Sequence, residues 1–259
     1  MLAQQRQQAI LERVRRDGGV RVAELVRELG VSDMTIRRDL EALAERGLVE
    51  KVHGGATASG PGSTEEPGFT AKATRQREEK EAIARRAAQL VRPGTAIALS
   101  AGTTTWALAQ FLTEVPELTV ITNSIPVADV FHRVPRNDRT VVLTGGVRTP
   151  SDALVGPVAV AAIRGLHVDT LFLGVHGMSV RAGFTTPNLL ESETDRALVA
   201  CATRLVVLAD HTKWQTVGIS TIAELSQADA VVSDAGLEEA ARRELSEHVG
   251  ELIIAEVPR

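Results

Sequence analysis

Residues 30–56 read GVSDMTIRRDLEALAERGLVEKVHGGA, which divides into a turn, a helix and a short β-ribbon. Gly30 predicts the end of a preceding helix, because glycine adopts the left-handed conformation that closes many helices. Ser32 or Asp33 can cap the next helix by accepting hydrogen bonds from the unpaired N–H groups of its first turn. Apolar residues then recur at helical spacing and predict one buried face, formed by Ile36, Leu40 and Leu43.

The same helix has a polar surface that is suited to a DNA major groove. Arginine binds guanine or phosphate through two parallel hydrogen bonds, and threonine contacts a base or a phosphate. The alternative is that Arg37 and Arg38 are only solvated charges, and the fit of the whole unit argues against it. Asp39 is expected to orient an arginine rather than to meet phosphate. The residues that point away from the apolar face are Met34, Thr35, Arg37 and Arg38.

A tight ribbon follows this helix. Gly47 predicts the end of the helix, and residues 48–52 alternate weakly between apolar and charged side chains, as strands do. His53, Gly54 and Gly55 then supply a turn, and His53 and Gly54 are added to the predicted DNA contacts. Upstream, residues 3–16 and 22–29 predict two more helices with apolar faces, which completes a small trihelical core. The sequence therefore predicts a winged helix-turn-helix DNA-binding domain over residues 1–57.

The composition is typical of a globular protein, with 259 residues, 44% hydrophobic and 24% charged. No apolar run approaches the roughly 20 residues of a membrane helix, and the N-terminus lacks a signal-peptide core, so a cytoplasmic protein is expected. The single Cys201 excludes an intrachain disulfide, and its apolar neighbours predict a buried thiol. The six histidines lack ligand spacing, so neither a metal nor a cofactor is expected.

Bulk charge does not indicate nucleic acid. The net charge is −4, and residues 1–57 hold ten basic against nine acidic residues, which leaves 19 against 24 for the rest. DNA binding must therefore depend on where the arginines are placed. One copy is expected to bind DNA weakly, with an affinity that depends strongly on salt concentration. A dimer or tetramer would multiply the small number of DNA contacts that one copy makes.

Residues 58–70 are rich in glycine, proline, serine and glutamate and cannot build a core, which predicts a linker. A charged helical stretch with one apolar stripe follows over residues 71–91. Its Arg75, Arg77 and Lys80 are interpreted as a solvated face. This stretch opens a second domain, residues 71–259.

Short apolar runs alternate with helices from residue 93 onward. Near-continuous apolar strands of this kind predict an α/β domain, whose sheet is mostly parallel and covered by helices on both faces. The predicted strands are residues 96–99, 118–121, 140–143, 169–174, 205–209, 230–232 and 252–254.

Small polar motifs follow five of these strands, at the position where open α/β sheets bind ligands. Glycine lets backbone N–H groups approach an anion, a helix N-terminus adds positive charge, and a lysine suits a phosphate or carboxylate. Singly, such motifs are more often a helix cap, a turn or a structural histidine, and Asp210 could simply cap a turn or pair with Lys213. Together they predict an anion-binding site formed by Ser100, Gly102, Thr103, Thr104, Thr105, Asn123, Ser124, Gly145, Gly146, His176, Gly177 and Lys213.

A set of motifs runs through residues 6–56: Arg6, Ile10, VAEL at 22–25, LGVS at 29–32, TIRRDL at 35–40, Leu43, Gly47 and HGGA at 53–56. On these motifs, this half resembles the N-terminal winged helix-turn-helix of the DeoR family of bacterial transcriptional regulators. The resemblance implies that the second and third helices read DNA, with contacts from Ser32, Met34, Thr35, Arg37 and Arg38.

A second set runs through residues 93–234: GTTT at 102–105, ITNS at 121–124, LTGG at 143–146, LVGP at 154–157, FLG at 172–174, GFTT at 183–186 and DHTK at 210–213. This half resembles the DeoR-family C-terminal sensor domain, which is related in fold to ribose-5-phosphate isomerase and coenzyme A transferases. The resemblance implies a phosphorylated sugar or related metabolite as effector. Many members carry aspartate where this chain has Ser100, which leaves the identity of the sugar open.

The leading hypothesis is a repressor of a sugar-metabolism operon. Its affinity for double-stranded operator DNA would be controlled by a phosphorylated sugar, through two arrangements of a homodimer or homotetramer. The alternative is a sugar-phosphate isomerase with an appended DNA-binding domain. Isomerisation needs a positioned general base. Only Asp210 and Asp152 are candidates for that base, so the regulator is favoured.

Overall fold

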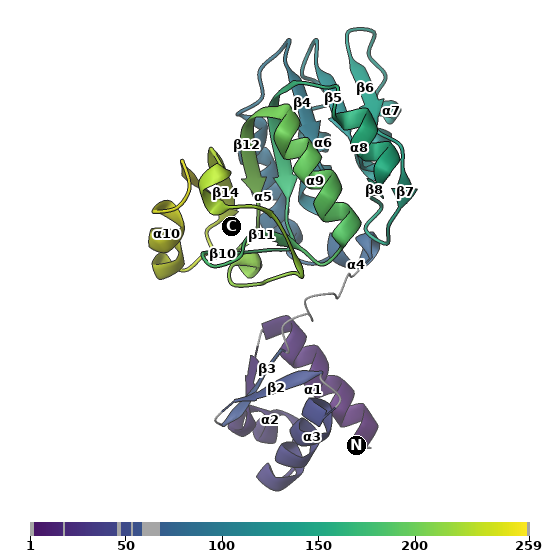
Figure 1. Ribbon diagram of the computed structural model, residues 1–259. Coiled ribbons are helices and arrows are strands. Elements are labelled where there is room, and N and C mark those ends of the chain that lie inside the picture. Colours follow the sequence, from purple (N-terminus) through teal and green to yellow (C-terminus); the bar gives the residue numbers. More distant parts are fainter. Residues whose placement is uncertain (1–2, 18, 46–47, 53, 59–67, 258–259) are drawn as a thin grey trace. The chain divides into compact units, whose positions relative to one another are not determined.

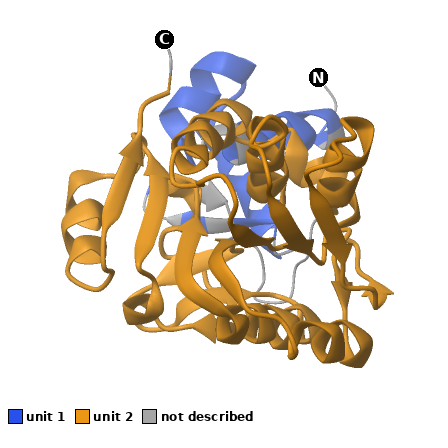
Figure 2. Ribbon diagram, turned by 90° about the horizontal axis from the view of Figure 1, so that it is seen from above, with its two compact units in different colours: residues 1–62 blue, residues 63–259 orange. Residues whose placement is uncertain are grey.

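The computed structural model describes residues 3–17, 19–45, 48–52, 54–58 and 68–257. The chain divides into two compact units, residues 1–62 and residues 63–259 (Figure 2). Each unit has its own hydrophobic core. Two predicted positions, Gly47 and His53, lie outside the described residues.

The N-terminal unit is a winged helix-turn-helix, as predicted (Figure 1). Ile36, Leu40 and Leu43 are buried at 0%, 2% and 1% exposure, which confirms the predicted apolar face. Its sheet pairs antiparallel in the order β1-β3-β2, and β1 is a strand that the sequence did not predict. The elements are α1 (Ala3–Asp17), β1 (Gly19–Arg21), α2 (Val22–Leu29), α3 (Asp33–Glu45), β2 (Val49–Val52) and β3 (Gly55–Ala58).

Asp39 carries a buried charge inside this unit. Its carboxylate accepts hydrogen bonds from Arg6 Nε at 2.5 Å and from Gln7 Nε2 at 3.1 Å, both on α1. Asp39 therefore does orient an arginine, but that arginine is Arg6 rather than its neighbour Arg38. Because a buried charge is tolerated only when it is paired and hydrogen-bonded, this contact fastens α1 to α3.

The C-terminal unit is built on one seven-stranded sheet in the order β15-β14-β12-β9-β4-β5-β6. Every neighbouring pair in this sheet is parallel, which confirms the predicted α/β class. The strands are β4 (Ala96–Leu99), β5 (Thr119–Thr122), β6 (Thr140–Leu143), β9 (Val168–Gly174), β12 (Ala202–Leu208), β14 (Ala230–Asp234) and β15 (Leu252–Ala255).

Helices cover both faces of this sheet, because successive strand residues point to opposite sides. Ile97 and Leu99 of β4 join one core cluster, which includes residues of α5, α6 and α7. Ala98 joins the other cluster, which includes residues of α8, α9 and α10. Figure 1 shows α9 lying across its face of the sheet. The helices are α5 (Arg77–Ala88), α6 (Thr103–Phe111), α7 (Ile125–Arg133), α8 (Pro157–Ile163), α9 (Leu189–Cys201) and α10 (Glu239–Ser246).

Several short elements of this unit were not predicted. A three-stranded antiparallel sheet and a two-stranded hairpin lie beside the main sheet. All four residues of β11 are buried, so the strand shows no alternation that a sequence pattern could reveal. These elements are β7 (Val147–Arg148), β8 (Leu154–Val155), β10 (Gly177–Ser179), β11 (Gly183–Thr186), β13 (Ser220–Ala223), and the 3₁₀ turns η1 (His211–Lys213) and η2 (Leu225–Gln227).

The predicted linker and the helix after it need correction. Phe69 and Thr70, predicted as linker, begin a short helix, α4 (Phe69–Ala73). The Phe69 ring packs edge-on against Trp106, with ring centroids 5.9 Å apart. The Gly/Pro-rich sequence around Phe69 does not predict this tertiary contact. The single helix predicted over residues 71–91 is broken at Gln76, whose φ of 48° is left-handed.

The expectations drawn from composition can be compared with the described residues. Cys201 is buried at 8% exposure, as predicted, and burial raises the pKa of its thiol. No described helix is both long and apolar enough to cross a membrane. No described group of three or more His, Cys, Asp or Glu residues could hold a metal ion.

Replacing Asp39 with alanine is expected to destabilise the N-terminal unit by about 3–5 kcal/mol, because the buried ion pair between Asp39 and Arg6 is broken. Hydrogen exchange of the α1 and α3 amides in the full chain would measure the loss. The matched control is Asp33→Ala, which removes an exposed ion pair with Arg37 and should cost about 1 kcal/mol or less. Equal effects of the two substitutions would refute the buried role of Asp39.

Candidate functional site: the carboxyl edge of the sheet and the third helix

The order of the main sheet reverses at β4. From β4 the chain proceeds to β5 and β6 on one side, whereas β9 and β12 extend the other side. In open parallel sheets, the helices flanking such a reversal separate and leave a crevice beyond the carboxyl ends of the strands. The motifs that follow these strands therefore share one edge of the sheet.

Two buried side chains hold the strand ends together at this reversal. Ser100, which follows β4, accepts a hydrogen bond at 2.9 Å from the backbone N–H of Gly174 at the end of β9. On the other side, Asn123 Oδ1 accepts a hydrogen bond at 2.9 Å from the N–H of Ala101. Both side chains are almost fully buried. They therefore position the backbone that surrounds the crevice.

Helix α6 begins at this edge. Its N-cap residue is Gly102, which has no side chain to cap the first turn, Thr103–Thr105. By contrast, Ser124 caps α7 by accepting a hydrogen bond from the N–H of Val127. The first-turn N–H groups of an uncapped helix and the positive end of its dipole attract an anion.

The end of β12 brings charge to the same edge. Asp210 is buried and caps η1 by accepting a hydrogen bond from the N–H of Thr212 at 3.1 Å. Of the two alternatives for Asp210, the cap is therefore confirmed, and within the described part of the chain no ion pair joins Asp210 to Lys213. Beside them, His211 Nδ1 lies 2.8 Å from Asp234 Oδ2, and this hydrogen bond raises the pKa of His211.

Lys80 is a further residue at this edge, and the sequence interpretation misplaced it. Its side chain is buried at 6% exposure instead of lying on a solvated face. The Nζ atom donates hydrogen bonds to the carbonyl oxygens of Lys72 and Arg75 at 2.6 and 2.5 Å. Burial lowers the pKa of Lys80 to about 8, against the attraction of Asp210. The density of charged residues in this stretch does not distinguish the buried Lys80 from the neighbouring Arg75 and Arg77, which are exposed.

The predicted residues cannot all touch one small ligand. They follow five adjacent strands, β12 to β6, and at about 4.8 Å between neighbouring strands these span roughly 19 Å. At Gly146 and Gly177 a Cβ would lie 2.5 Å from Val155 O and 2.0 Å from Thr216 O, respectively. Close packing therefore requires glycine at both positions without any ligand. Gly145, at the outer strand β6, and the half-buried His176 lie beside these two positions.

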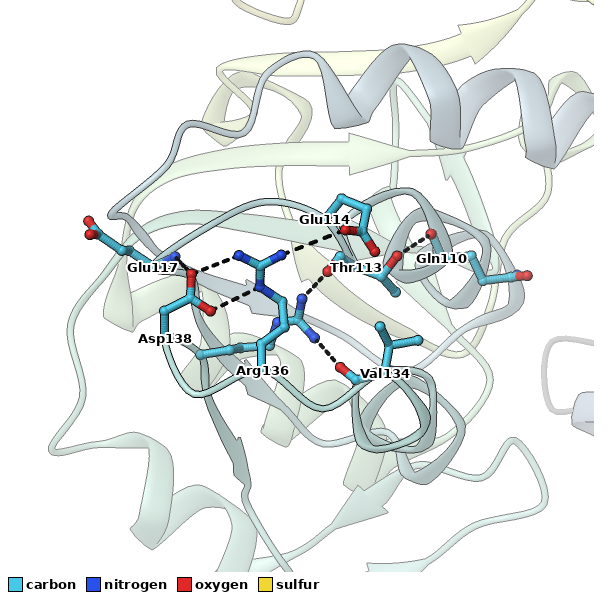
Figure 3. A network of polar contacts seen from close by, with 8 residues as sticks. Gln110, Thr113, Glu114, Glu117, Val134, Arg136 and Asp138 are labelled. Atoms are coloured by element: carbon cyan, nitrogen blue, oxygen red, sulfur yellow. Dashed lines mark hydrogen bonds and ion pairs between the residues drawn. The ribbon is translucent and has the colours of Figure 1, made fainter.

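A groove of the C-terminal unit lies elsewhere. It has a volume of about 470 Å³ and is lined by residues of α7, β6 and the loop between them, including Phe131, Arg136 and Leu143. Figure 3 shows Arg136 paired with Asp138 at 2.8 Å and reaching Glu114 at 3.6 Å. No predicted anion-binding residue lines this groove. Arg136 is paired, and Arg139 donates to the carbonyl oxygens of Val134 and Thr113, although its buried Nε has no partner among the described residues. The carboxyl edge carries the predicted anion-binding motifs, so it is the better candidate.

The predicted DNA contacts lie at the start of α3. Met34 is 74% exposed, an unusual position for a large apolar side chain unless it meets a partner. Arg37 and Arg38 are also exposed, and Arg37 Nε lies 2.5 Å from Asp33 Oδ1. Ser32 caps the helix by accepting a hydrogen bond from the N–H of Thr35 at 3.3 Å.

The wing lies beside this helix. Strands β2 and β3 pair from Val49 opposite Ala58 to Val52 opposite Gly55, and the exposed Gly54 turns between them with φ of 81°. Lys51 on β2 forms an ion pair with Glu41 on α3 at 2.8 Å. This pair fixes the ribbon against the helix whose first turn carries the predicted contacts.

Comparison with known proteins matches both units. Residues 6–60 match the DeoR-like helix-turn-helix domain, and residues 75–235 match the DeoR C terminal sensor domain. Among solved structures, ribose 5 phosphate isomerase A from Neisseria gonorrhoeae has a TM-score of 0.40 at 15% identity, over 55% of this chain and 56% of that chain.

Full-length relatives are named as regulators. The uncharacterized HTH-type transcriptional regulator YgbI of Escherichia coli (strain K12) is 37% identical over 98% of this chain and 99% of its own length. The HTH-type transcriptional regulator GolR of Listeria innocua serovar 6a is 37% identical over 89% of this chain and 90% of its own length. The glycerol-3-phosphate regulon repressor of E. coli (strain K12) is 33% identical over the same shares. This chain is accordingly a DNA-binding transcriptional regulator and not an isomerase, and it belongs to the DeoR family.

Proposed function

We propose that the protein is a cytoplasmic repressor of a sugar-metabolism operon, released from its operator by a phosphorylated sugar or related metabolite. Residues 1–57 bind DNA, residues 58–70 join the units, and residues 71–259 sense the effector and hold two or four copies together. Among the relatives, the names of the glycerol-3-phosphate regulon repressor and of the putative aga operon transcriptional repressor of E. coli O157:H7 support this class of regulated genes.

On this proposal the first turn of α3 enters the major groove. Arg37 and Arg38 contact guanine or phosphate, and Met34 supplies an apolar contact to a base. Ser32 and Thr35 contact the phosphate backbone next to the helix N-terminus, where anions are favoured. The turn of the wing, at His53 and Gly54, contacts the neighbouring backbone.

The observation that carries the effector assignment is the uncapped start of α6 at the strand reversal. A phosphate group would accept hydrogen bonds from the N–H groups of residues 103–105 and from the hydroxyls of Thr103 and Thr104, because the Thr105 hydroxyl already donates to the Gly102 carbonyl. Lys213 adds a positive charge from the end of β12. Ser100 and Asn123 position the surrounding backbone, and the sugar hydroxyls extend along the carboxyl edge. Such a ligand controls DNA affinity only if it binds the two arrangements of the oligomer with different affinities.

Replacing Arg38 with alanine is expected to weaken binding to the DNA upstream of the protein's own gene by about 1–3 kcal/mol, because a guanine or phosphate contact is lost. Fluorescence anisotropy at two salt concentrations would measure both the affinity and its salt dependence. The control Arg243→Ala removes an equally exposed arginine of α10, which pairs with Glu239, and should leave binding unchanged. Unaltered affinity of the Arg38 variant would contradict the proposed orientation of α3.

A phosphorylated sugar that binds the carboxyl edge is expected to stabilise the folded protein by about 2.7 kcal/mol at 100 times its Kd. A thermal-shift screen of sugar phosphates would find it, and the same compound should weaken DNA binding. Lys213→Met should reduce its affinity about tenfold or more, because a charge-assisted hydrogen bond is lost.

The control for this prediction is Arg164→Met, in a separate groove between α8 and α9. That variant should bind the compound as the wild type does. If Arg164→Met weakened binding of the compound and Lys213→Met did not, the site at the carboxyl edge would be wrong.

A further inference from the structure

Helix α4 is the first described segment after the linker, and it is fastened to the carboxyl edge of the sheet. The N–H of Phe69 donates a hydrogen bond to the carbonyl of Pro150 at 3.1 Å. The Phe69 ring packs on Trp106, in the first turns of α6. Lys72 Nζ donates a hydrogen bond to Ser151 Oγ at 3.3 Å. The segment that joins the sensor unit to the linker thus lies against the elements that form the candidate effector site.

Lys80 adds contacts at the far end of α4, where the Lys72 carbonyl also accepts a hydrogen bond from the N–H of Arg75 at 3.3 Å. Lys80 Nζ donates to the carbonyl oxygens of Lys72 and Arg75, which belong to the last turn of α4 and the turn after it. The carbonyl groups at a helix C-terminus have no partners within the helix and favour a cation. The left-handed Gln76 turns the chain between α4 and α5, so that Lys80 can reach back to these oxygens.

The charges of Asp210 and Lys213, which follow β12, act on the same ammonium group, as do those of Arg75 and Glu79. An ammonium group has three N–H donors. Two of these N–H groups donate to carbonyl oxygens within the described residues. The third can donate to an anionic group beside Lys213.

We propose that Lys80 is the residue through which effector binding is transmitted to the linker: an anionic group of the effector binds its ammonium and thereby tightens its hold on α4. This inference rests on the proposed effector site at the carboxyl edge. The partner that Lys80 recognises is a phosphate or a similarly compact dianion.

The energetics favour a coupling role over a purely structural one. Burying an ammonium group costs free energy, and the nearby Lys213 and Arg75 repel it, so the pKa of Lys80 falls to about 8. Its charge is therefore only marginally favoured near neutral pH. A bound dianion would raise this pKa and stabilise the charged form, which is the form that binds the α4 carbonyl groups most strongly.

Hydrogen exchange of residues 69–76 in the full-length protein tests the proposal, with glycerol 3-phosphate, ribose 5-phosphate and inorganic phosphate as probes. The probe that raises the thermal stability of the protein should slow exchange in residues 69–76 about tenfold. Exchange in α10 should stay unchanged. In Lys80→Met, residues 69–76 should exchange rapidly with or without the probe. The matched control Arg77→Met removes an exposed charge one turn earlier on α5 and should respond as the wild type does.

A pH series provides a second test, whose wild-type arm does not depend on the folding of a variant. Phosphate monoesters stay dianionic above pH 7.5, whereas Lys80 loses its proton as the pH rises through about 8. Probe affinity in the wild type should therefore fall about tenfold or more between pH 7.5 and pH 9.5. In Lys80→Met it should be weaker at pH 7.5 and nearly independent of pH.

The outcomes separate this inference from the proposed function. If no probe changes thermal stability or DNA binding, the proposed effector class is wrong, and the coupling role of Lys80 is lost with it. If a probe does both but leaves exchange in residues 69–76 unchanged, or if Lys80→Met responds as the wild type does, the coupling role alone is overturned.

Discussion

The hydrogen bond between Ser100 Oγ and the N–H of Gly174 ties β4 to β9 where the order of the sheet reverses. Because all seven strands are parallel, their carboxyl ends lie at one edge, and the reversal opens that edge between two helices. Every feature of the candidate effector site depends on this constraint. The start of α6 lies there, and the end of β12 brings Asp210 and Lys213 to the same side.

In each unit a buried charged side chain holds two helices together. In the N-terminal unit, Asp39 on α3 binds Arg6 on α1. In the C-terminal unit, Lys80 on α5 binds the carbonyl groups at the end of α4. Such contacts add little net stability, since desolvation opposes them, but breaking one is costly. They fix the helices that meet DNA and the linker, which are the places where a regulator needs defined positions.

The division of labour follows from these positions. The first turn of α3 exposes an apolar side chain and two guanidinium groups, which a sheet edge could not present to a groove. The carboxyl edge collects N–H groups and lysines without assembling a described metal cluster. The family assignment agrees with both, because each unit matches its own DeoR domain over most of its length.

The sequence by itself determined the two folds. Helical and near-continuous apolar spacing identified the buried face at Ile36, Leu40 and Leu43 and all seven strands of the main sheet, since periodicity reflects which side chains face a core. Only the tertiary structure decided the partner of Asp39, the burial of Lys80, the helix at Phe69 and the packing roles of Gly146 and Gly177. Each of these depends on a contact between residues far apart in the chain or in separate elements, and local spacing carries no information about such contacts.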